Sequence, residues 1–152
     1  MKLLIAAGGT GGHIFPGIAV AEFFVAKGRD MQAVFVGTHD GMEGRIIPQY
    51  GFRLLFVKAR QFLGRNVLYK LATLFGLMQG ILTCMRIIRE EKPDAILGMG
   101  GYTSVPAVFA GVLTGKPTFL HEQNIEPGLA NKMLSRFAKK TFISFEDTKK
   151  HL

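Results

Sequence analysis

Cysteine is almost absent from this sequence. The single cysteine, Cys84, stands in an apolar helical pattern, which excludes a disulfide framework and a metal site built on cysteines. We expect it to pack in the core as a small apolar side chain. Repeats and low-complexity tracts are also absent, and the 152 residues suit one domain with one substantial core.

We expect neither a secretory leader nor a membrane span. Met1-Lys2 leads into a short apolar run and then into glycines, where a signal peptide would have a longer apolar region and a cleavage site. Between Lys70 and Arg86 lie fifteen uncharged residues, too few for a helix to cross a hydrocarbon core of about 30 Å. We therefore expect a protein of the reducing cytosol.

Basic residues outnumber acidic residues in this sequence. The chain has 19 Lys and Arg against 11 Asp and Glu, and its net charge of +8 favours a phosphorylated substrate, an anionic lipid surface or a nucleic acid as partner. Because no zinc pattern, recognition helix or basic run interleaved with aromatics is present, we expect no nucleic acid. Basic residues flank the uncharged segment: Lys58, Arg60, Arg65 and Lys70 precede it, and Arg86 and Arg89 follow it.

Short apolar runs alternate with helical patterns. The runs that predict strands are Lys2–Ala7, Gln32–Val36, Arg53–Val57, Ala95–Leu97, Thr118–His121 and Thr141–Ser144. The helical patterns are Ile14–Lys27, Met42–Tyr50, Val67–Glu91, Val105–Leu113 and Leu129–Ala138. This alternation predicts an α/β fold with a doubly wound, Rossmann-like parallel sheet, in which ligands bind outside the carboxyl ends of the strands.

Two glycine-rich turns follow predicted strands. The first is Gly8-Gly9-Thr10-Gly11-Gly12-His13, and the second is Gly98-Met99-Gly100-Gly101-Tyr102, which leads through Thr103 and Ser104, both possible N-caps, into a helix. Glycine lets a ligand approach the backbone, and the N–H groups at a helix start favour an anion. His13 can take or give a proton near neutral pH. The alternative is that such turns only let a helix pack closely on the sheet.

Two nucleotide-binding patterns fail at these turns. In the first turn Gly9 and Gly11 fit G-x-G-x-x-G, but Ile14 occupies the third position, and no acidic residue stands at the end of the second strand. A phosphate-binding loop of the GxxxxGK[ST] type is excluded because Lys116 precedes Pro117 and lacks the required upstream glycine spacing.

Four polar residues, His121-Glu122-Gln123-Asn124, follow the fifth predicted strand. We favour a hydrogen-bonding site for a hydroxyl-rich ligand. The structural alternative is that Asn124 caps the turn and Glu122 pairs with a lysine. We expect no metal site, because neighbouring strand residues such as His121 and Glu122 point to opposite faces and no metal-binding spacing is present.

The helix predicted from Val67 to Ile88 has apolar residues nearly all round. It is either buried, or its outer face meets a membrane surface with the help of the basic neighbours. Gly76 and Gly80 would let it approach the sheet. The residues expected to cover the sheet are Val67, Leu71, Leu74, Met78, Ile81, Met85 and Ile88, with Leu68, Phe75 and Leu77 on or near the other side.

Together, the two glycine turns and the polar tetrad, in this order and spacing, resemble the MurG family of bacterial glycosyltransferases. The resemblance runs from Met1 to about Lys140 and weakens after Ser144. It implies the N-terminal half of a GT-B glycosyltransferase: residues 1–152 would be the acceptor and membrane-associating domain, without the C-terminal UDP-sugar domain. The family transfers N-acetylglucosamine from UDP-N-acetylglucosamine to lipid I, undecaprenyl-pyrophosphoryl-N-acetylmuramoyl-pentapeptide, giving lipid II for peptidoglycan. We expect the isolated domain to be inactive.

The resemblance also implies roles for individual residues. Thr10, Gly11 and Gly12 would approach the donor diphosphate or sugar, Gly100, Gly101 and Tyr102 would hold the acceptor pyrophosphate, and Asn124 would bind a sugar, with His121 and Gln123 beside it. His13 is the candidate base for the acceptor 4-hydroxyl, and Glu122 is its rival. Direct displacement with inversion needs no metal and no cofactor if helix N-termini stabilise the departing UDP.

The uncharged helix would then meet the cytoplasmic leaflet of the inner membrane, so that the protein would be peripheral. Two alternatives stay open: the acceptor-side, membrane-associated subunit of a split GT-B N-acetylglucosaminyltransferase, and a nucleotide-binding Rossmann domain. The polar tetrad disfavours the split-enzyme subunit, and the incomplete glycine pattern disfavours the nucleotide-binding domain.

Overall fold

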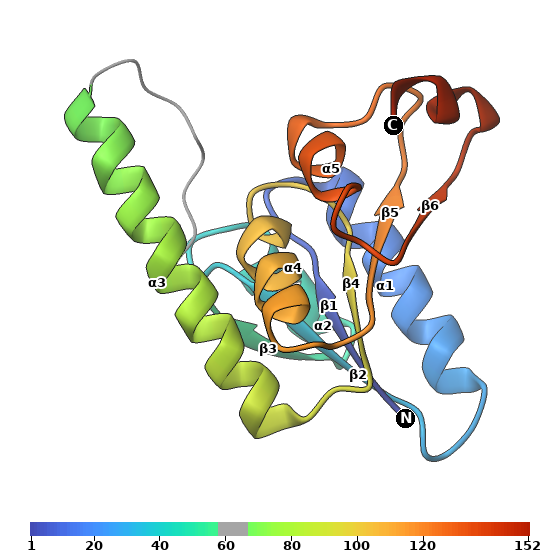
Figure 1. Ribbon diagram of the computed structural model, residues 1–152. Helices are drawn as coiled ribbons and strands as arrows, with labels where there is room; N and C mark the ends of the chain where they lie inside the picture. The colour runs from blue at the N-terminus through green and yellow to red at the C-terminus, as the bar shows by residue number, and fades with distance from the viewer. Residues whose placement is uncertain (58–66) are drawn as a thin grey trace.

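A parallel sheet forms the centre of the computed structural model, which describes residues 1–57 and 67–152, with side chains in the second part from Ala72 onward (Figure 1). Within these residues the strands are β1 (Lys2–Ala6), β2 (Gln32–Gly37), β3 (Arg53–Phe56), β4 (Ala95–Gly98), β5 (Thr118–Glu122) and β6 (Lys140–Ile143). Their order is β3-β2-β1-β4-β5-β6, and all neighbours are parallel. The predicted doubly wound, Rossmann-like sheet is confirmed.

Helices cover both faces of the sheet. They are α1 (Gly11–Ala26), α2 (Glu43–Gln49), α3 (Val67–Glu91), α4 (Ser104–Leu113), α5 (Leu129–Leu134) and a 3₁₀ turn, η1 (Glu146–His151). Alternation along β1 separates the two cores, because Leu3 and Ile5 pack with α1 and α2, whereas Leu4 and Ala6 pack with α3 and α4. A third cluster joins α4 to α5.

The strand order reverses between β1 and β4, because β2 lies on one side of β1 and β4 on the other. In doubly wound sheets this switch point leaves a crevice outside the carboxyl ends of the two strands. The first glycine turn follows β1 and the second follows β4. The topology therefore brings together two segments about ninety residues apart in the chain.

The first helix begins earlier than its apolar pattern predicts, at Gly11 and not at Ile14. The carbonyl of Thr10 accepts hydrogen bonds from the N–H groups of His13 and Ile14, so the glycines form the first helical turn. At the other end of the chain, α5 ends at Leu134, four residues before the predicted boundary at Ala138. β5 extends one residue further than predicted, to Glu122.

One face of α3 departs from the prediction. Leu74 and Met78, expected to cover the sheet, are 56% and 51% exposed, whereas Leu77, expected on or near the other side, packs against the α4–α5 cluster. Ile81, Cys84, Met85, Ile87 and Ile88 contact the sheet core. Figure 1 shows the N-terminal half of α3 extending past α4, so only the C-terminal half lies over the sheet. Gly80 is buried, but a Cβ at Gly76 would meet nothing within 4 Å, so Gly76 is not needed for this approach.

The C-terminal end of α3 is tied to the sheet by charge. Glu91, with a side chain only 10% exposed, lies 3.1 Å from Nζ of Lys2 and 2.8 Å from a guanidinium nitrogen of Arg53. Lys58, Arg60 and Arg65 lie outside the described residues, as do the side chains of Val67, Leu68, Lys70 and Leu71. Of the described helices, none combines the length and the apolar character that crossing a membrane requires.

The close approach of α4 to the sheet gives a stability prediction. A Cβ at Gly111 would lie 2.6 Å from both Cδ1 of Ile96 and Oγ1 of Thr118. We expect Gly111→Ala to lower the free energy of unfolding by about 1–3 kcal/mol through overpacking. The matched change Gly76→Ala, in open space on α3, should raise it by about 0.5–1 kcal/mol. Urea unfolding of both variants measures this, and equal effects would contradict the packing described here.

Candidate active site

The first glycine turn is held by a buried carboxylate. Gly9 takes a positive φ of 89°, and its N–H donates to Oε2 of Glu43 over 3.2 Å. The other oxygen, Oε1, accepts from the N–H and the hydroxyl of Thr38 at 2.9 and 2.6 Å. Glu43 is the first residue of α2 and is fully buried. It therefore joins the ends of β1 and β2.

Glycines make room for this carboxylate. A Cβ at Gly8 would lie 2.6 Å from Oε1 of Glu43, a Cβ at Gly37 would lie 2.6 Å from its Cγ, and one at Gly41 would collide with the carboxylate itself. Sequence reasoning missed Glu43. Along the chain Glu43 is only an acidic residue near the start of a predicted helix, between Gly41 and Gly44, and this position does not mark its contact with Gly9.

The second glycine turn touches the first. Gly100 and Gly101 take positive φ values of 98° and 74°, and the ring of Tyr102 lies 3.1 Å from the position of a Cβ at Gly9. The hydroxyl oxygens of Tyr102 and Thr38 are 3.3 Å apart. One chain of contacts therefore runs from the second turn through Thr38 to Glu43 and the first turn.

The sequence analysis named Thr103 and Ser104 as possible N-caps of α4, but neither side chain makes a capping hydrogen bond. Thr103 occupies the N-cap position without a side-chain cap bond, and α4 begins at Ser104. The buried Ser104 hydroxyl accepts from the N–H of Gly100 at 2.9 Å and lies within hydrogen-bonding distance of the carbonyls of Ala6 and Gly100. Its role is to fix the second turn against β1.

His13 lies between the two turns, half-buried in the first turns of α1. Its Nδ1 is 3.0 Å from the hydroxyl of Thr10, and its Nε2 would be 2.9 Å from a Cβ at Gly100. Burial lowers the pKa of His13 below the usual 6.5, and the charge of Glu122 partly offsets that effect. The imidazole is therefore neutral near pH 7, the state that a general base requires.

The polar tetrad shapes its own loop. Glu122, 1% exposed, accepts four hydrogen bonds, from the backbone N–H groups of Asn124 and Gly128 and from the side-chain amides of Asn124 and Asn131. The structural alternative had Glu122 paired with a lysine; in the structure its partners are backbone N–H groups and side-chain amides instead. Gln123 donates to the carbonyl of Met99 over 2.8 Å, which ties the loop to the second glycine turn.

Three atoms beside this loop are buried without a hydrogen-bond partner among the described residues: Nδ1 of His121, Oε1 of Gln123 and Oδ1 of Asn131. Burial also lowers the pKa of His121, again with a smaller opposing effect from Glu122. Asn124 is exposed, and its carbonyl accepts from the hydroxyl of Thr148 at 2.9 Å. Buried polar atoms are normally paired, so these three mark a place where a ligand or water would add bonds.

A pocket of about 520 Å³ opens between the two glycine turns and α5. Four predicted site residues line it: Thr10, His13, Gly101 and Tyr102. The other predicted residues, Gly11, Gly12, Gly100 and the tetrad, do not. The sequence analysis missed the apolar part of the lining, which consists of Val105, Leu129, Ala130 and Met133.

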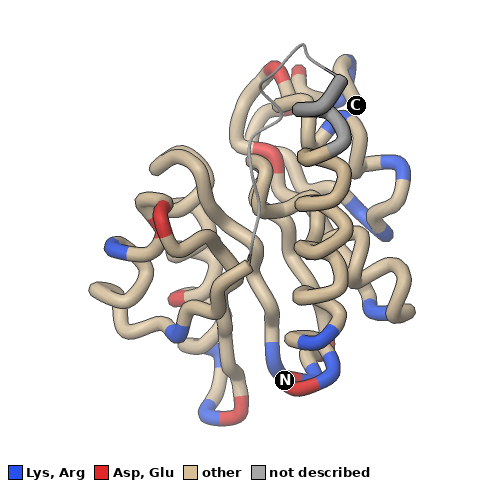
Figure 2. The backbone as a smooth tube through the Cα atoms, turned by 90° about the vertical axis from the view of Figure 1, so that its left-hand side faces the viewer, with Lys and Arg blue, Asp and Glu red and all other residues tan. Residues whose placement is uncertain are grey.

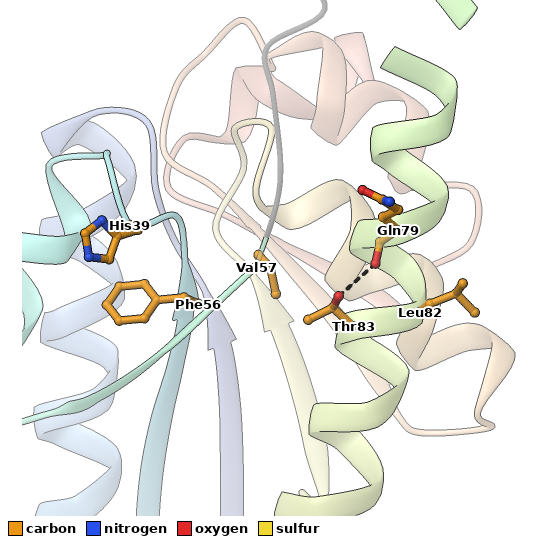
Figure 3. A pocket seen from close by; sticks show the side chains of 6 residues that line it. All are labelled: His39, Phe56, Val57, Gln79, Leu82 and Thr83. Atoms are coloured by element: carbon orange, nitrogen blue, oxygen red, sulfur yellow. Dashed lines mark hydrogen bonds between the residues drawn. The ribbon is translucent and has the colours of Figure 1, made fainter. Parts of the chain in front are cut away.

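A second pocket, of about 610 Å³, lies between the end of β3 and α3 (Figure 3). His39 and Phe56 pack ring against ring on one side, with centroids 5.1 Å apart, and Gln79, Leu82 and Thr83 of α3 line the other. This pocket contains none of the predicted site residues. Within residues 1–57 and 67–152, no group of three His, Cys, Asp or Glu side chains is placed to hold a metal ion.

The sheet topology and the paired glycine turns define a Rossmann-like α/β domain with a pocket at its switch point, and comparison with known proteins identifies the family. The glycosyltransferase family 28 N-terminal domain matches residues 3–143, so the chain belongs to that family. A curated relative from Geotalea uraniireducens, named UDP-N-acetylglucosamine--N-acetylmuramyl-(pentapeptide) pyrophosphoryl-undecaprenol N-acetylglucosamine transferase, is 49% identical over 99% of this chain. A relative of the same name from Myxococcus xanthus is 46% identical over 98%.

Solved structures agree with this assignment. The crystal structure of Acinetobacter baumannii MurG matches 97% of this chain with a TM-score of 0.84 and 34% identity. The UDP-GlcNAc 2-epimerase of Neisseria meningitidis, at 18% identity and a TM-score of 0.72, shares the fold. The chain spans about two fifths of the curated relatives' length, 41% of the Geotalea protein, and 42% of the Acinetobacter chain.

The environment of His13 gives a pH prediction. An NMR titration of its imidazole should show a midpoint below 6.5, and Glu122→Gln should lower the midpoint further because the charge that raises the pKa is gone. Because the pKa of His13 is lower in the folded chain than in the unfolded chain, the unfolded chain binds the proton more tightly. The contribution of His13 to the free energy of unfolding should therefore fall as pH drops from about 6.5 through the folded midpoint. A midpoint at or above 6.5 would contradict the burial of this side chain.

Proposed function

We propose that this chain is the acceptor-side, N-terminal domain of an enzyme that transfers N-acetylglucosamine from UDP-N-acetylglucosamine to undecaprenyl-pyrophosphoryl-N-acetylmuramoyl-pentapeptide. The observation that supports it most is the pocket in which His13 lies between two touching glycine turns, in a chain of this family whose relatives have that name. The alternative of a nucleotide-cofactor domain has no comparable support.

In the proposed reaction, neutral His13 removes the proton of the acceptor 4-hydroxyl while that oxygen attacks the anomeric carbon of the donor. The bond from that carbon to the UDP oxygen breaks, UDP leaves, and the configuration inverts. The Thr10 hydroxyl, 3.0 Å from Nδ1, orients the imidazole or relays the proton. The N–H groups of Gly11 and Gly12, in the first turn of α1, have no acceptor within the helix and favour a diphosphate.

The second turn and the tetrad complete the proposal. Gly100, Gly101 and Tyr102 support the acceptor pyrophosphate, and exposed Asn124 contacts a sugar. His121 and Gln123 would reach a sugar hydroxyl, directly or through water, by their unpartnered Nδ1 and Oε1 atoms. For Glu122 we infer a positioning role instead of a base role, because four N–H donors already occupy its carboxylate.

The exposed face of α3 supports membrane association. Leu74, Phe75, Met78 and Leu82 are between 51% and 66% exposed. The sequence has no charged residue from Ala72 to Met85, and Arg86 and Arg89 follow. In Figure 2 the described part of α3 is accordingly tan up to the basic residues near its C-terminal end. A face of this kind suits an anionic lipid surface, through burial of its apolar side chains and the charge of its basic neighbours. We propose that it meets the cytoplasmic leaflet, where a polyprenyl-linked acceptor is anchored.

The activity is tested with two proteins. The 152-residue chain alone should not turn over UDP-N-acetylglucosamine, whereas the chain joined to the C-terminal half of its Geotalea relative should. In the joined protein, His13→Ala should lower kcat by about 10²–10⁴-fold and His39→Gln should not, because only His13 lies in the pocket. Turnover by the 152-residue chain, or full activity of His13→Ala, would contradict the proposal.

Membrane association is tested by flotation of the chain with vesicles containing about a third anionic lipid. The wild type should float, and the double change Leu74→Gln with Phe75→Gln should abolish flotation by removing apolar burial. Leu113→Gln, an equally exposed leucine on α4, is the matched control and should float like the wild type. Flotation unaffected by the α3 changes would place the membrane contact elsewhere.

A further inference from the structure

A carboxylate lies buried behind the first glycine turn. Glu43 accepts from the N–H of Gly9 on Oε2, and from the N–H and the hydroxyl of Thr38 on Oε1. In the part of the chain that the structure describes, no ion pair involves Glu43. Burying a charge that no cation neutralises is costly, and a negative charge here opposes an anionic ligand on the turn. The stability of the fold alone does not account for a carboxylate at this position.

The three hydrogen-bond donors around Glu43 account for it. A carboxylate offers only acceptor atoms, so it can face Gly9 on one side and Thr38 on the other. In Glu43→Gln, an NH₂ group replaces one of the two oxygens. Whichever way that amide turns, the NH₂ group meets another donor, either the N–H of Gly9 or the N–H of Thr38. Only a carboxylate therefore holds both segments together.

One side of this contact leads to the candidate base. Gly9 is followed by Thr10, whose carbonyl accepts from the N–H of His13 and whose hydroxyl lies 3.0 Å from Nδ1 of that imidazole. Glu43 is not among the residues that line the pocket, so it acts on His13 from behind, through Gly9 and Thr10. A displacement of Gly9 would move the imidazole with it.

The other side of the contact leads to Tyr102. The Thr38 hydroxyl has one proton and donates it to Glu43 over 2.6 Å. In the 3.3 Å contact between the hydroxyls of Thr38 and Tyr102, Tyr102 is therefore the donor. Through Thr38, Glu43 thus holds the ring that lines the pocket on the side of the second glycine turn.

We infer that Glu43 is a positioning residue for the proposed transfer reaction, on which the inference rests. From outside the pocket it holds His13 and Tyr102, which belong to two separate glycine turns, in one geometry. A misplacement of about 1 Å can lower the rate of an enzymatic step by about 10²-fold. The contacts of Glu43 therefore matter to the reaction itself and not only to folding.

The test uses the joined protein described above. Glu43→Gln should lower kcat by about 10–100-fold and change KM for UDP-N-acetylglucosamine by less than about threefold, because the base is displaced while the donor keeps its contacts with the other half. The matched control is Glu91→Gln, which removes a carboxylate of 10% exposure at the amino ends of β1 and β3. It should lower the unfolding temperature and leave kcat unchanged.

Thr38 provides further variants, which decide the question if Glu43→Gln does not fold. Thr38→Val removes the hydroxyl that joins Glu43 to Tyr102 and should lower kcat by about tenfold. Thr38→Ser keeps the hydroxyl and should recover most of the lost rate. Tyr102→Phe should cost less in the Thr38→Val background than in the unchanged protein, because the bond between the two hydroxyls is already absent there.

Hydrogen exchange of the Gly9 N–H in the 152-residue chain gives a readout that needs no activity. Glu43→Gln should speed this exchange by at least about tenfold relative to the strand amides of Leu4 and Ile5, whereas Glu91→Gln should not. Unchanged exchange at Gly9, unchanged kcat in Glu43→Gln, or an equal loss of kcat in Glu91→Gln would overturn the inference. Absence of turnover in the unchanged joined protein would remove the proposed function, and the exchange measurement would then decide alone whether Glu43 holds the turn.

Discussion

The position of the first glycine turn depends on the buried carboxylate of Glu43. It accepts from Gly9 on one oxygen and twice from Thr38 on the other, and Thr38 in turn lies beside the Tyr102 hydroxyl of the second turn. A bare backbone has little to hold it in place, because glycine has the largest conformational freedom to lose on folding. Hydrogen bonds to a buried charge are among the stronger ones in proteins, so this single side chain restricts both turns.

Glu122 holds the loop after β5 in place by accepting hydrogen bonds, as Glu43 does for the first glycine turn. Its carboxylate accepts from four N–H groups between Asn124 and Asn131, and so closes the loop that follows β5. A chain with a net charge of +8 thus buries two of its few acidic residues at the same edge of the sheet. Both are used to hold polypeptide at a site that we propose receives diphosphates.

The sheet was predictable because its signals are local. Apolar runs and helical spacing mark β1 through β6 along the sequence, and parallel pairing then follows from alternation. Glu43 was not predictable, because its contact with Gly9 joins positions 34 apart and nothing in the sequence marks that pairing. The start of α1 was missed because glycine has low helix propensity, whereas the Thr10 carbonyl fixes the first turn. The exposed face of α3 was assigned by spacing alone, but half of this helix extends beyond the sheet.

Cys84 lies where α3 rests on the sheet, completely buried, and burial raises the pKa of its thiol to about 12. In the folded chain this sulfur is therefore protonated and out of reach of oxidants and alkylating reagents. It becomes reactive only when the C-terminal half of α3 lifts from β1 and β4. The reactivity of this single thiol therefore depends on whether α3, which carries the proposed membrane face, is packed on the sheet. If contact with a lipid surface moved α3 away from the sheet, Cys84 would become open to oxidation and alkylation.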